Sequence, residues 1–330
     1  MVDFYFLKSI GELEGVEGLV AQYKFKPYYY YVDIQPDVLT KYLLRRLQSQ
    51  KERMFLAARE NKILALINFG YLPWDSKIFD LKMGRVFHII LEEDIREEML
   101  LSLLGLFNDE MKKQGYDFVD ISVNTREVKL IHNLLRIGFI LMGTSIINSI
   151  NLTNNDRYLS KTKIVQKDII FKEIEEVHIS DLLKLAENAF IEEGGNINRF
   201  YADNRLCNEK VGKLYRKWFE NCISGEQADK IFIAEHDKKA VGFIACKIQT
   251  TFLNTNKIIG SVPLNAIKKE YRKKGIYKDL LSMALKWFAS NGCSNVEIKT
   301  QLTTLGAHYV WEDFGGRLVS SEYNFHKWLK

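Results

Sequence analysis

Two stretches of the chain alternate between apolar and polar positions in a way that predicts paired strands. Residues 55–67, FLAARENKILALI, and residues 232–244, FIAEHDKKAVGFI, each place apolar runs on both sides of a short charged segment. Apolar runs of this length, bounded by polar residues that suit a turn, are typical of strands that face a core. Each half of the chain is therefore expected to contain a strand, a turn and a second strand.

The C-terminal half continues with patterns of both strand and helix. The strand pattern KIIGSVPLNAI at 257–267 contains Pro263, which cannot donate to a strand ladder and predicts a local break. NVEIKTQ at 295–301 predicts a further strand, 304–313 a short helix, and RLVSSEYNFHKWL a closing hairpin. Between them, apolar residues at helical spacing predict an amphipathic helix that ends near Asn291-Gly292: Ile276, Leu280, Leu281, Ala284, Leu285 and Phe288.

The two halves share one register. An offset of 177 residues pairs Phe55 with Phe232, Gly115 with Gly292 and Gly138 with Gly315. A single offset that serves widely separated segments indicates two copies of one fold. The polar stretch 151–168 lacks sustained periodicity, which is typical of a linker. We predict an α/β (α+β) protein with a degenerate domain at 1–153, a linker at 154–168 and a second domain at 169–330.

Composition places the chain among ordinary globular proteins. Hydrophobic residues make up 47% of the 330 residues and charged residues 27%, which is too apolar for a disordered chain. The net charge of +5 suits an anionic ligand, and no dense interleaving of basic and aromatic residues indicates nucleic acid. The N-terminus lacks a signal-peptide pattern and no apolar run approaches membrane-spanning length, so we expect a cytoplasmic protein without a membrane partner.

The cysteines give no indication of a metal site. They form no CxxC pair and have no histidine at ligand spacing, so neither a metal nor a disulfide is expected. All four lie in the second half: Cys207, Cys222, Cys246 and Cys293.

One short segment, YRKKGIYKDLL at 271–281, places three basic residues and a glycine at the start of the predicted helix. A helix start carries unpaired N–H donors and a partial positive charge, so added cations are unfavourable there unless an anion binds. Gly275 lets the backbone approach a ligand closely, and successive amides from 273 to 278 can converge on a diphosphate. The segment therefore predicts a phosphate-binding loop.

The order of strand, basic glycine loop, helix, strand, short helix and closing strands resembles the GNAT superfamily of acyl-CoA-dependent N-acyltransferases. The segment RKKGIY at 272–277 is similar to that superfamily's pyrophosphate loop, except that Tyr277 replaces a small residue. The resemblance implies tandem GNAT-like folds, each a mixed, mostly antiparallel sheet flanked by helices. It also implies acetyl-CoA (coenzyme A) as co-substrate, no metal, and these contacts: Arg272, Lys273, Lys274, Gly275, Ile276, Tyr277, Lys278, Thr304 and Trp311. Arg272 and the lysines are expected to supply charge for the 3′-phosphate of coenzyme A.

A narrower resemblance covers parts of both halves. Arg199-Phe200-Tyr201-Ala202-Asp203, LYRKW at 214–218 and Thr300-Gln301 look like the TDP-fucosamine acetyltransferase group, and so does LPWDS at 72–76. That group acetylates an amino group on a nucleotide-linked deoxysugar. The resemblance implies a small-molecule amine acceptor, a nucleotide sugar, that is contacted by Arg199, Tyr201 and Gln301.

Departures from the superfamily pattern concern the catalytic groups. Trp311 stands where the superfamily often carries a tyrosine acid, so His308 or water is left to protonate the leaving thiolate. A backbone amide at Ala266 or Ile267 is expected to polarise the thioester carbonyl. For the base, the resemblance indicates three carboxylates without choosing between them: Glu192, Glu193 and Asp203.

The first copy differs at the matching loop. The offset places Ile95 at the position of Arg272 and Glu98 at that of Gly275, within the acidic segment ILEEDIREEML. Carboxylates and bulk there repel a diphosphate. The first copy is therefore expected to bind no coenzyme A, to complete the core and to wall the acceptor cleft.

The leading interpretation is an N-acetyltransferase that uses acetyl-CoA and a nucleotide-linked amino deoxysugar. One alternative is a tandem-GNAT peptide or aminoacyl transferase, against which the intact diphosphate loop argues. Another is a catalytically silent acyl-CoA-binding module, which the departures at Tyr277 and Trp311 favour. A homodimer is left open.

Overall fold

The computed structural model describes residues 2–7, 15–48, 52–60, 62–153, 168–190, 198–252 and 257–330. The chain forms two compact units, which are described separately. The first unit is Met1–Gly143 with Glu322–Lys330, and the second unit is Thr144–Ser321. Apart from Asp168, the expected linker at 154–168 lies outside the described residues.

The first unit contains a mixed sheet in the order β1-β2-β3-β4-β5-β13. These strands are Asp3–Leu7, Glu52–Arg59, Lys62–Tyr71, Met83–Leu91, Phe118–Asn124 and Arg317–Trp328. β4 and β5 run parallel, and the other pairs run antiparallel. The helices of this unit are α1 (Val16–Gln22), α2 (Pro36–Leu47), α3 (Pro73–Phe79), α4 (Glu97–Lys113) and α5 (Val128–Arg136).

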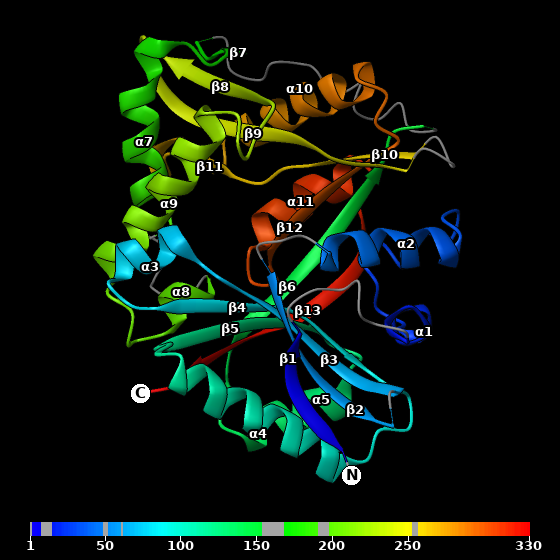
Figure 1. The fold of residues 1–330 in the computed structure, drawn as a ribbon. Coiled ribbons are helices and arrows are strands. Elements are labelled where there is room, and N and C mark those ends of the chain that lie inside the picture. Colours follow the sequence, from blue (N-terminus) through cyan, green and yellow to red (C-terminus); the bar gives the residue numbers. More distant parts are fainter. Residues whose placement is uncertain are drawn as a thin grey trace. The chain divides into compact units, whose positions relative to one another are not determined.

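Successive side chains of β2 pack into two different cores, one on each face of this sheet. Phe55 and Ala57 join the core that α4 and α5 bury, whereas Met54 and Leu56 join the core under α1 and α2. Successive side chains of a strand point to opposite faces, so an apolar strand without alternation is buried on both. Figure 1 shows α1 and α2 on one side of this sheet and α4 and α5 on the other.

The second unit has a matching sheet in the order β6-β12-β10-β9-β8-β7, and β11 pairs with β9 beside this path. In chain order these strands are β6 (Ile140–Asn151), β7 (Ile170–Glu173), β8 (Lys230–His236), β9 (Lys239–Phe252), β10 (Lys257–Ser261), β11 (Asn265–Ile267) and β12 (Asn295–Gln301). β10 and β12 are parallel, and the remaining pairs are antiparallel.

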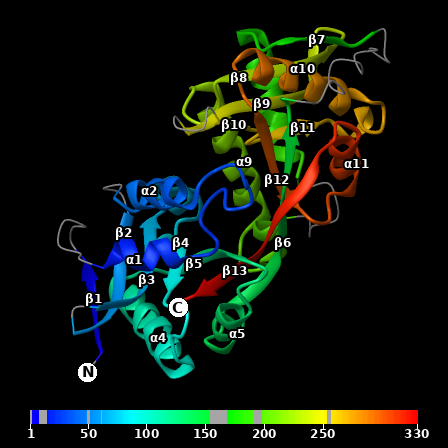
Figure 2. The ribbon, with the colours of Figure 1, turned by 90° about the vertical axis from the view of Figure 1, so that its right-hand side faces the viewer.

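Helices cover both faces of the second sheet. They are α7 (Ile179–Asn188), α8 (Arg199–Ala202), α9 (Asn208–Ile223), α10 (Ile276–Ser290) and α11 (Leu305–Asp313), with 3-10 turns at Glu176–His178 and Lys269–Tyr271. On β9, Ile244 joins the core under α10 and α11, and the Phe243 ring lies 4.2 Å from that of Phe219 on α9. α10 crosses β8 and β9 (Figure 2).

The elements confirm the internal repeat. Adding 177 to Phe118–Asn124, Val128–Arg136 and Ile140–Asn151 gives the bounds of β12, α11 and β13. The paired glycines also share a conformation, since Gly138 and Gly315 have φ values of 81° and 79°. The predicted class, two mixed and mostly antiparallel sheets flanked by helices, is confirmed.

The last strand of each copy lies in the unit of the other copy. β13 pairs with β5 over Glu322–Trp328, and β6 pairs with β12 over Ser145–Asn151. The boundaries expected from sequence, 1–153 and 169–330, keep each strand with its own copy and so differ from the compact units. The expected closing hairpin is wrong, because Arg317–Trp328 is one continuous strand.

Within the described ranges, no helix is long and apolar enough to cross a bilayer. The same residues hold no group of three or more side chains that could coordinate a metal ion.

Candidate functional site

The strand that leads to the basic loop separates from its neighbour at Pro263. β10 pairs with β12 over Ile259–Ser261, whereas β11, after the proline, pairs with β9. β12 continues to Gln301 along β6. Proline cannot donate to a ladder, so the break predicted from the sequence is confirmed. After Pro263, β11 forms no strand pairing with β12 among the described residues. Unpaired strand edges can bind extended ligands through backbone hydrogen bonds.

The amide of Ile267 lies on the edge of β11 that faces away from β9. The next amide along the chain, that of Lys268, donates to the Val241 carbonyl of β9 at 2.9 Å. Amides of successive strand residues point to opposite edges. The Ala266 amide therefore faces β9, and of the two predicted amides that of Ile267 is directed toward the unpaired edge.

The loop before α10 has the backbone shape of an anion-binding loop. Lys273 and Gly275 have positive φ values of 60° and 83°, and Gly275 is the N-cap of α10 without a side-chain cap. Among the described residues, the amides of 273 to 277 find no backbone acceptor. Successive free amides with this alternating backbone form a concave set of donors for phosphate. With Lys273 and Lys274 exposed beside them, these amides fit the diphosphate of coenzyme A.

The side chain of Arg272 is directed toward protein carbonyls. Its Nε donates to the Ile267 carbonyl at 3.0 Å, and its Nη2 donates to the Ala189 carbonyl at 3.0 Å. The sequence predicts a charge for the 3′-phosphate at this position. In this geometry the exposed Lys273 and Lys274 are better placed than Arg272 to meet a phosphate.

Tyr277 and Trp311, the two departures from the superfamily pattern, are hydrogen-bonded to each other. Nε1 of Trp311 donates to the Tyr277 hydroxyl at 2.7 Å, and Trp311 is 1% exposed. Burial raises the pKa of the Tyr277 hydroxyl above its ordinary value, and the hydrogen bond from Trp311 only partly opposes this. The Tyr277 phenol is therefore protonated at neutral pH. Its hydroxyl contacts Trp311 of α11.

The other predicted residues near α11 have protein partners. His308 Nε2 lies 3.3 Å from the Gln301 carbonyl, which can only accept, so this nitrogen carries the hydrogen. The Gln301 side chain donates to Ser145 Oγ at 3.1 Å, and Lys278 pairs with Asp313 at 2.5 Å. Thr304 is the half-buried N-cap of α11. His308 thus lacks a spare proton for a leaving group when its ring is neutral.

An aromatic cluster surrounds α8, where the predicted acceptor contacts lie. Asn198 caps this helix by accepting from the amides of Phe200 and Tyr201, and Tyr201 stacks on Tyr215 at 6.5 Å. The buried Tyr201 hydroxyl has no hydrogen-bond partner among the described residues, and burial raises its pKa to about 12. A buried hydroxyl without a partner is costly, which favours a role in binding a ligand. Arg199 lies over the Phe200 ring at 4.9 Å.

Of the three predicted bases, only Asp203 lies among the described residues. Asp203 is 2% exposed, and its carboxylate accepts from the Arg205 amide at 3.1 Å. It therefore stabilises the turn between α8 and α9. Glu192 and Glu193 lie outside the described residues.

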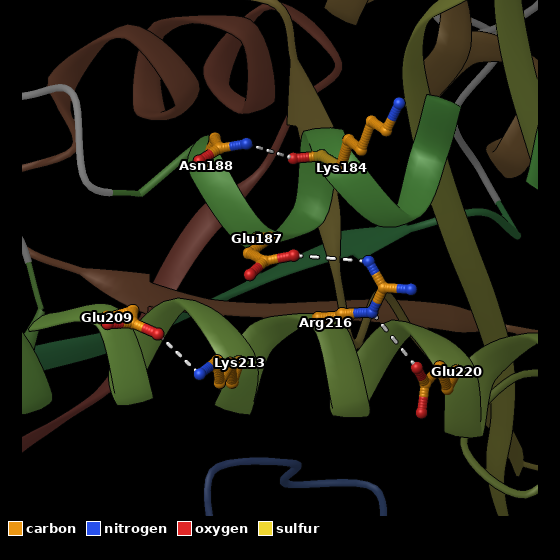
Figure 3. A network of polar contacts seen from close by, with 7 residues as sticks. All are labelled: Lys184, Glu187, Asn188, Glu209, Lys213, Arg216 and Glu220. Carbon is orange, nitrogen blue, oxygen red and sulfur yellow. Dashed lines mark hydrogen bonds and ion pairs between the residues drawn. The ribbon is translucent and has the colours of Figure 1, made fainter. Parts of the chain in front are cut away.

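Ion pairs join α7 to α9 beside this cluster (Figure 3). Arg216 of α9 lies 3.3 Å from Glu187 of α7 and 3.4 Å from Glu220 of its own helix. Lys213 pairs with Glu209 along α9 at 2.5 Å. Exposed pairs of this kind are each worth at most about 1 kcal/mol, so they orient the helices more than they stabilise them.

The matching loop of the first unit is closed by other contacts. Ile95, at the position of Arg272, is 2% exposed, and its carbonyl accepts from the Lys129 ammonium. Glu97 and Glu98 occupy the first turn of α4. This arrangement lacks the glycine and the exposed lysines of the second unit. That the first copy binds no coenzyme A stays a prediction.

Comparison with known proteins shows that part of the second unit is similar to a family of acetyltransferases. The sequence model of the Acetyltransferase (GNAT) family matches residues 197–315. A curated relative, N-alpha-acetyltransferase MAK3 of Arabidopsis thaliana, is 26% identical over 95 residues, which are 29% of this chain and 48% of the relative. The match thus spans about half the length of that relative.

Solved structures are similar over the whole chain. A GCN5-related N-acetyltransferase from Sphaerobacter thermophilus has a TM-score of 0.66 at 12% identity, with 99% of this chain and 96% of that chain covered. A tandem GNAT protein from the clavulanic acid biosynthesis pathway has a TM-score of 0.63 at 10% identity, with 100% and 99% covered. At these identities the likeness shows the fold, so the predicted tandem GNAT fold is confirmed.

The enzyme class predicted from the sequence is confirmed at the level of the family. The family match lies within the second unit and includes the loop, α10 and α11. Sequence reasoning missed the Ala189 carbonyl as a partner of Arg272 and the contact between Tyr277 and Trp311. No sequence signal indicates either contact, because the partners are 83 and 34 residues apart.

Proposed function

We propose that the second unit transfers an acetyl group from acetyl-CoA to the primary amine of a nucleotide-linked amino deoxysugar. The observation that carries this proposal is the loop at 273–277, whose free amides follow directly on strands that diverge at Pro263. The family match supports an acetyltransferase, and the resemblance at 199–203 supports the sugar nucleotide as acceptor.

In this reaction the loop amides and Lys273 and Lys274 hold the diphosphate and phosphates of the donor. The Ile267 amide donates to the thioester oxygen as negative charge develops on it, an effect worth about 3–4 kcal/mol in well-studied hydrolases. The amine nitrogen forms the new bond to the acyl carbon, and the carbon–sulfur bond then breaks. The amine loses one proton to water or to a carboxylate, and the thiolate gains one from water.

A peptide N-terminus is the second candidate acceptor. The observation that favours it is the relative named as an N-alpha-acetyltransferase. Both acceptors present a primary amine, so the transfer chemistry above is the same for either.

The experiment compares acceptors with the full chain and acetyl-CoA. TDP-fucosamine, glucosamine and a set of short peptides with free N-termini are supplied separately, and acetylated products are measured by mass spectrometry. The proposal expects TDP-fucosamine to have a kcat/KM at least about a hundredfold above the others, the size that hydrogen-bonded recognition readily supplies. Faster peptide acetylation would establish the second candidate, and coenzyme A binding without any product would establish a silent module.

A further inference from the structure

Arg272 is the residue of the basic loop whose side chain is directed into the second unit. Among its contacts, two hydrogen bonds at 3.0 Å each reach the carbonyls of Ile267 in β11 and Ala189 at the end of α7. We infer that Arg272 is a positioning residue that joins the thioester side of the site to the acceptor side, while phosphate binding falls to Lys273, Lys274 and the loop amides. This inference rests on the proposed function.

The end of α7 is a suitable place for a cation. The last carbonyls of a helix have no intrahelical partner and carry a partial negative charge. α7 has no basic residue in its own last turn, and Ala189 is its C-cap. Arg272 supplies the missing charge from another element, and a guanidinium is suited to this because its donors lie in a rigid fork.

On the side of β11, Arg272 contacts the residue whose amide is predicted to bind the thioester oxygen. The Ile267 carbonyl accepts from Arg272 Nε. In an extended strand the N–H and C=O of one residue point to the same edge. Arg272 therefore contacts the unpaired edge of β11 at the same residue whose amide faces that edge.

On the side of α7, the contact reaches the aromatic cluster around α8. Phe190 follows Ala189 directly, and its ring stacks on Tyr215 at 4.1 Å. Tyr215 in turn stacks on Tyr201, whose buried hydroxyl finds no partner in the part of the chain that the structure describes. One guanidinium thus connects the residue expected at the thioester with the residues expected at the acceptor.

A phosphate ligand and a positioning residue predict different kinetics. Removing a phosphate ligand weakens coenzyme A binding and makes it depend less on salt. Removing a positioning residue leaves that affinity nearly unchanged and slows the reaction of the bound substrates, because small displacements at the reacting atoms are costly.

The test uses Arg272→Lys, which keeps the charge and loses the fork. We expect the Kd for coenzyme A, measured by calorimetry, to change less than about threefold. At saturating acetyl-CoA, kcat/KM for TDP-fucosamine should fall by about 10- to 100-fold. The matched control is Arg216→Lys, the same substitution at another arginine that contacts α7 and lies outside the loop. It should change neither quantity by more than about twofold.

A second readout needs no turnover. In 15N-labelled, ligand-free protein, one arginine Nε–H signal should exchange slowly with solvent and be absent from Arg272→Lys. It should shift little when coenzyme A is added. If Arg272→Lys does not fold, Arg272→Gln replaces it in both experiments.

Three outcomes decide between the roles. A Kd that rises more than about thirtyfold, or an Nε–H signal that shifts strongly with coenzyme A, would overturn the inference in favour of a phosphate ligand. Unchanged kcat/KM in Arg272→Lys would also overturn it. If coenzyme A binds but the wild type acetylates no amine, the proposed function fails, and the Kd and the Nε–H signal still decide the role of Arg272.

Discussion

Trp311 stands where the superfamily often has a tyrosine acid, and its indole is a poor proton donor in comparison. An indole N–H is only a donor, and here it is bonded to the Tyr277 hydroxyl at 2.7 Å. Trp311→Phe should therefore keep turnover within about tenfold of the wild type. It should lower stability by about 1–3 kcal/mol, because a buried contact and one hydrogen bond are lost. Steady-state kinetics and thermal unfolding measure the two effects.

The companion variant is Tyr277→Phe, which keeps the ring and leaves the Trp311 N–H without its acceptor. Its loss of stability should be of similar size, and the double variant should lose less than the sum because the two residues share one bond. A fall in turnover beyond about a hundredfold in Trp311→Phe, with stability unchanged, would mean that Trp311 takes part in the chemistry.

Glu127 makes the first unit sensitive to pH. Burial raises its pKa from an ordinary 4.5 to about 8, and the nearby Glu322 acts in the same direction. Between these values the folded protein keeps a proton that the unfolded chain releases, so stability falls as the pH rises through this window. Glu127→Gln removes the effect. Its advantage over the wild type should grow by up to about 1.4 kcal/mol per pH unit from pH 5 to 8.

Thermal unfolding of both proteins at pH 5 and pH 8 measures this difference. Parallel shifts of the two midpoints would mean that Glu127 is ionised in the folded protein. At the position of Glu127 in the repeat, the second unit has Thr304, so the matched control is Thr304→Ser, which should show no such dependence on pH.

The sequence predicts that Gly275 lets the backbone approach a phosphate, and this role stays a prediction. Its φ of 83° is a conformation that favours glycine, so the residue type at this position follows from the backbone alone. The direction of the Arg272 side chain was not predictable in this way. Its partner Ala189 is 83 residues distant and contributes only a carbonyl, which every residue possesses.

At the scale of elements, the exchange of the last strands is the main difference from the sequence prediction. β6 and β13 occupy equivalent positions in the repeat, and each follows a nine-residue helix. Local patterns predict that a strand exists, but two equivalent strands offer the same apolar alternation to either sheet. Which neighbour each one joins depends on the tertiary arrangement, which a pattern does not record.

The exchange predicts that the two halves of the chain hold together after cleavage. β13 completes the sheet of the first unit along Phe118–Asn124, and β6 borders β12 along Asn295–Gln301. With a protease site inserted within 154–167, the cleaved fragments should elute as one species in native size-exclusion chromatography. They should separate in denaturant, which serves as the control. Separate elution at micromolar concentration without denaturant would contradict the exchange.

Other elements are predicted correctly from the sequence, because a proline ends one strand pairing and a clear apolar pattern marks another strand. Pro263 ends the pairing of β10 with β12, and the segment 295–301 is the predicted strand. The hairpin expected at the C-terminus is wrong, because Arg317–Trp328 forms one strand and the polar pair Ser320-Ser321 lies within it.

At the scale of the whole molecule, one fold occurs twice with different loops. The second unit has Gly275 and exposed Lys273 and Lys274 before α10, and the first unit has Ile95 and Glu98 before and within α4. A diphosphate carries several negative charges, so the acidic helix start repels it and the basic loop attracts it. We therefore propose that each chain has one acyl-CoA site, in the second unit.

Isothermal calorimetry with coenzyme A tests this claim most directly. The wild type and Glu98→Gly should both bind one equivalent per chain with nearly equal affinity. Gly275→Glu should show no binding, because a side chain at the positive φ of this position is strained and its carboxylate repels phosphate. Thermal unfolding checks that this variant is folded. Two equivalents per chain, or full binding by folded Gly275→Glu, would contradict both the site and the degenerate first copy.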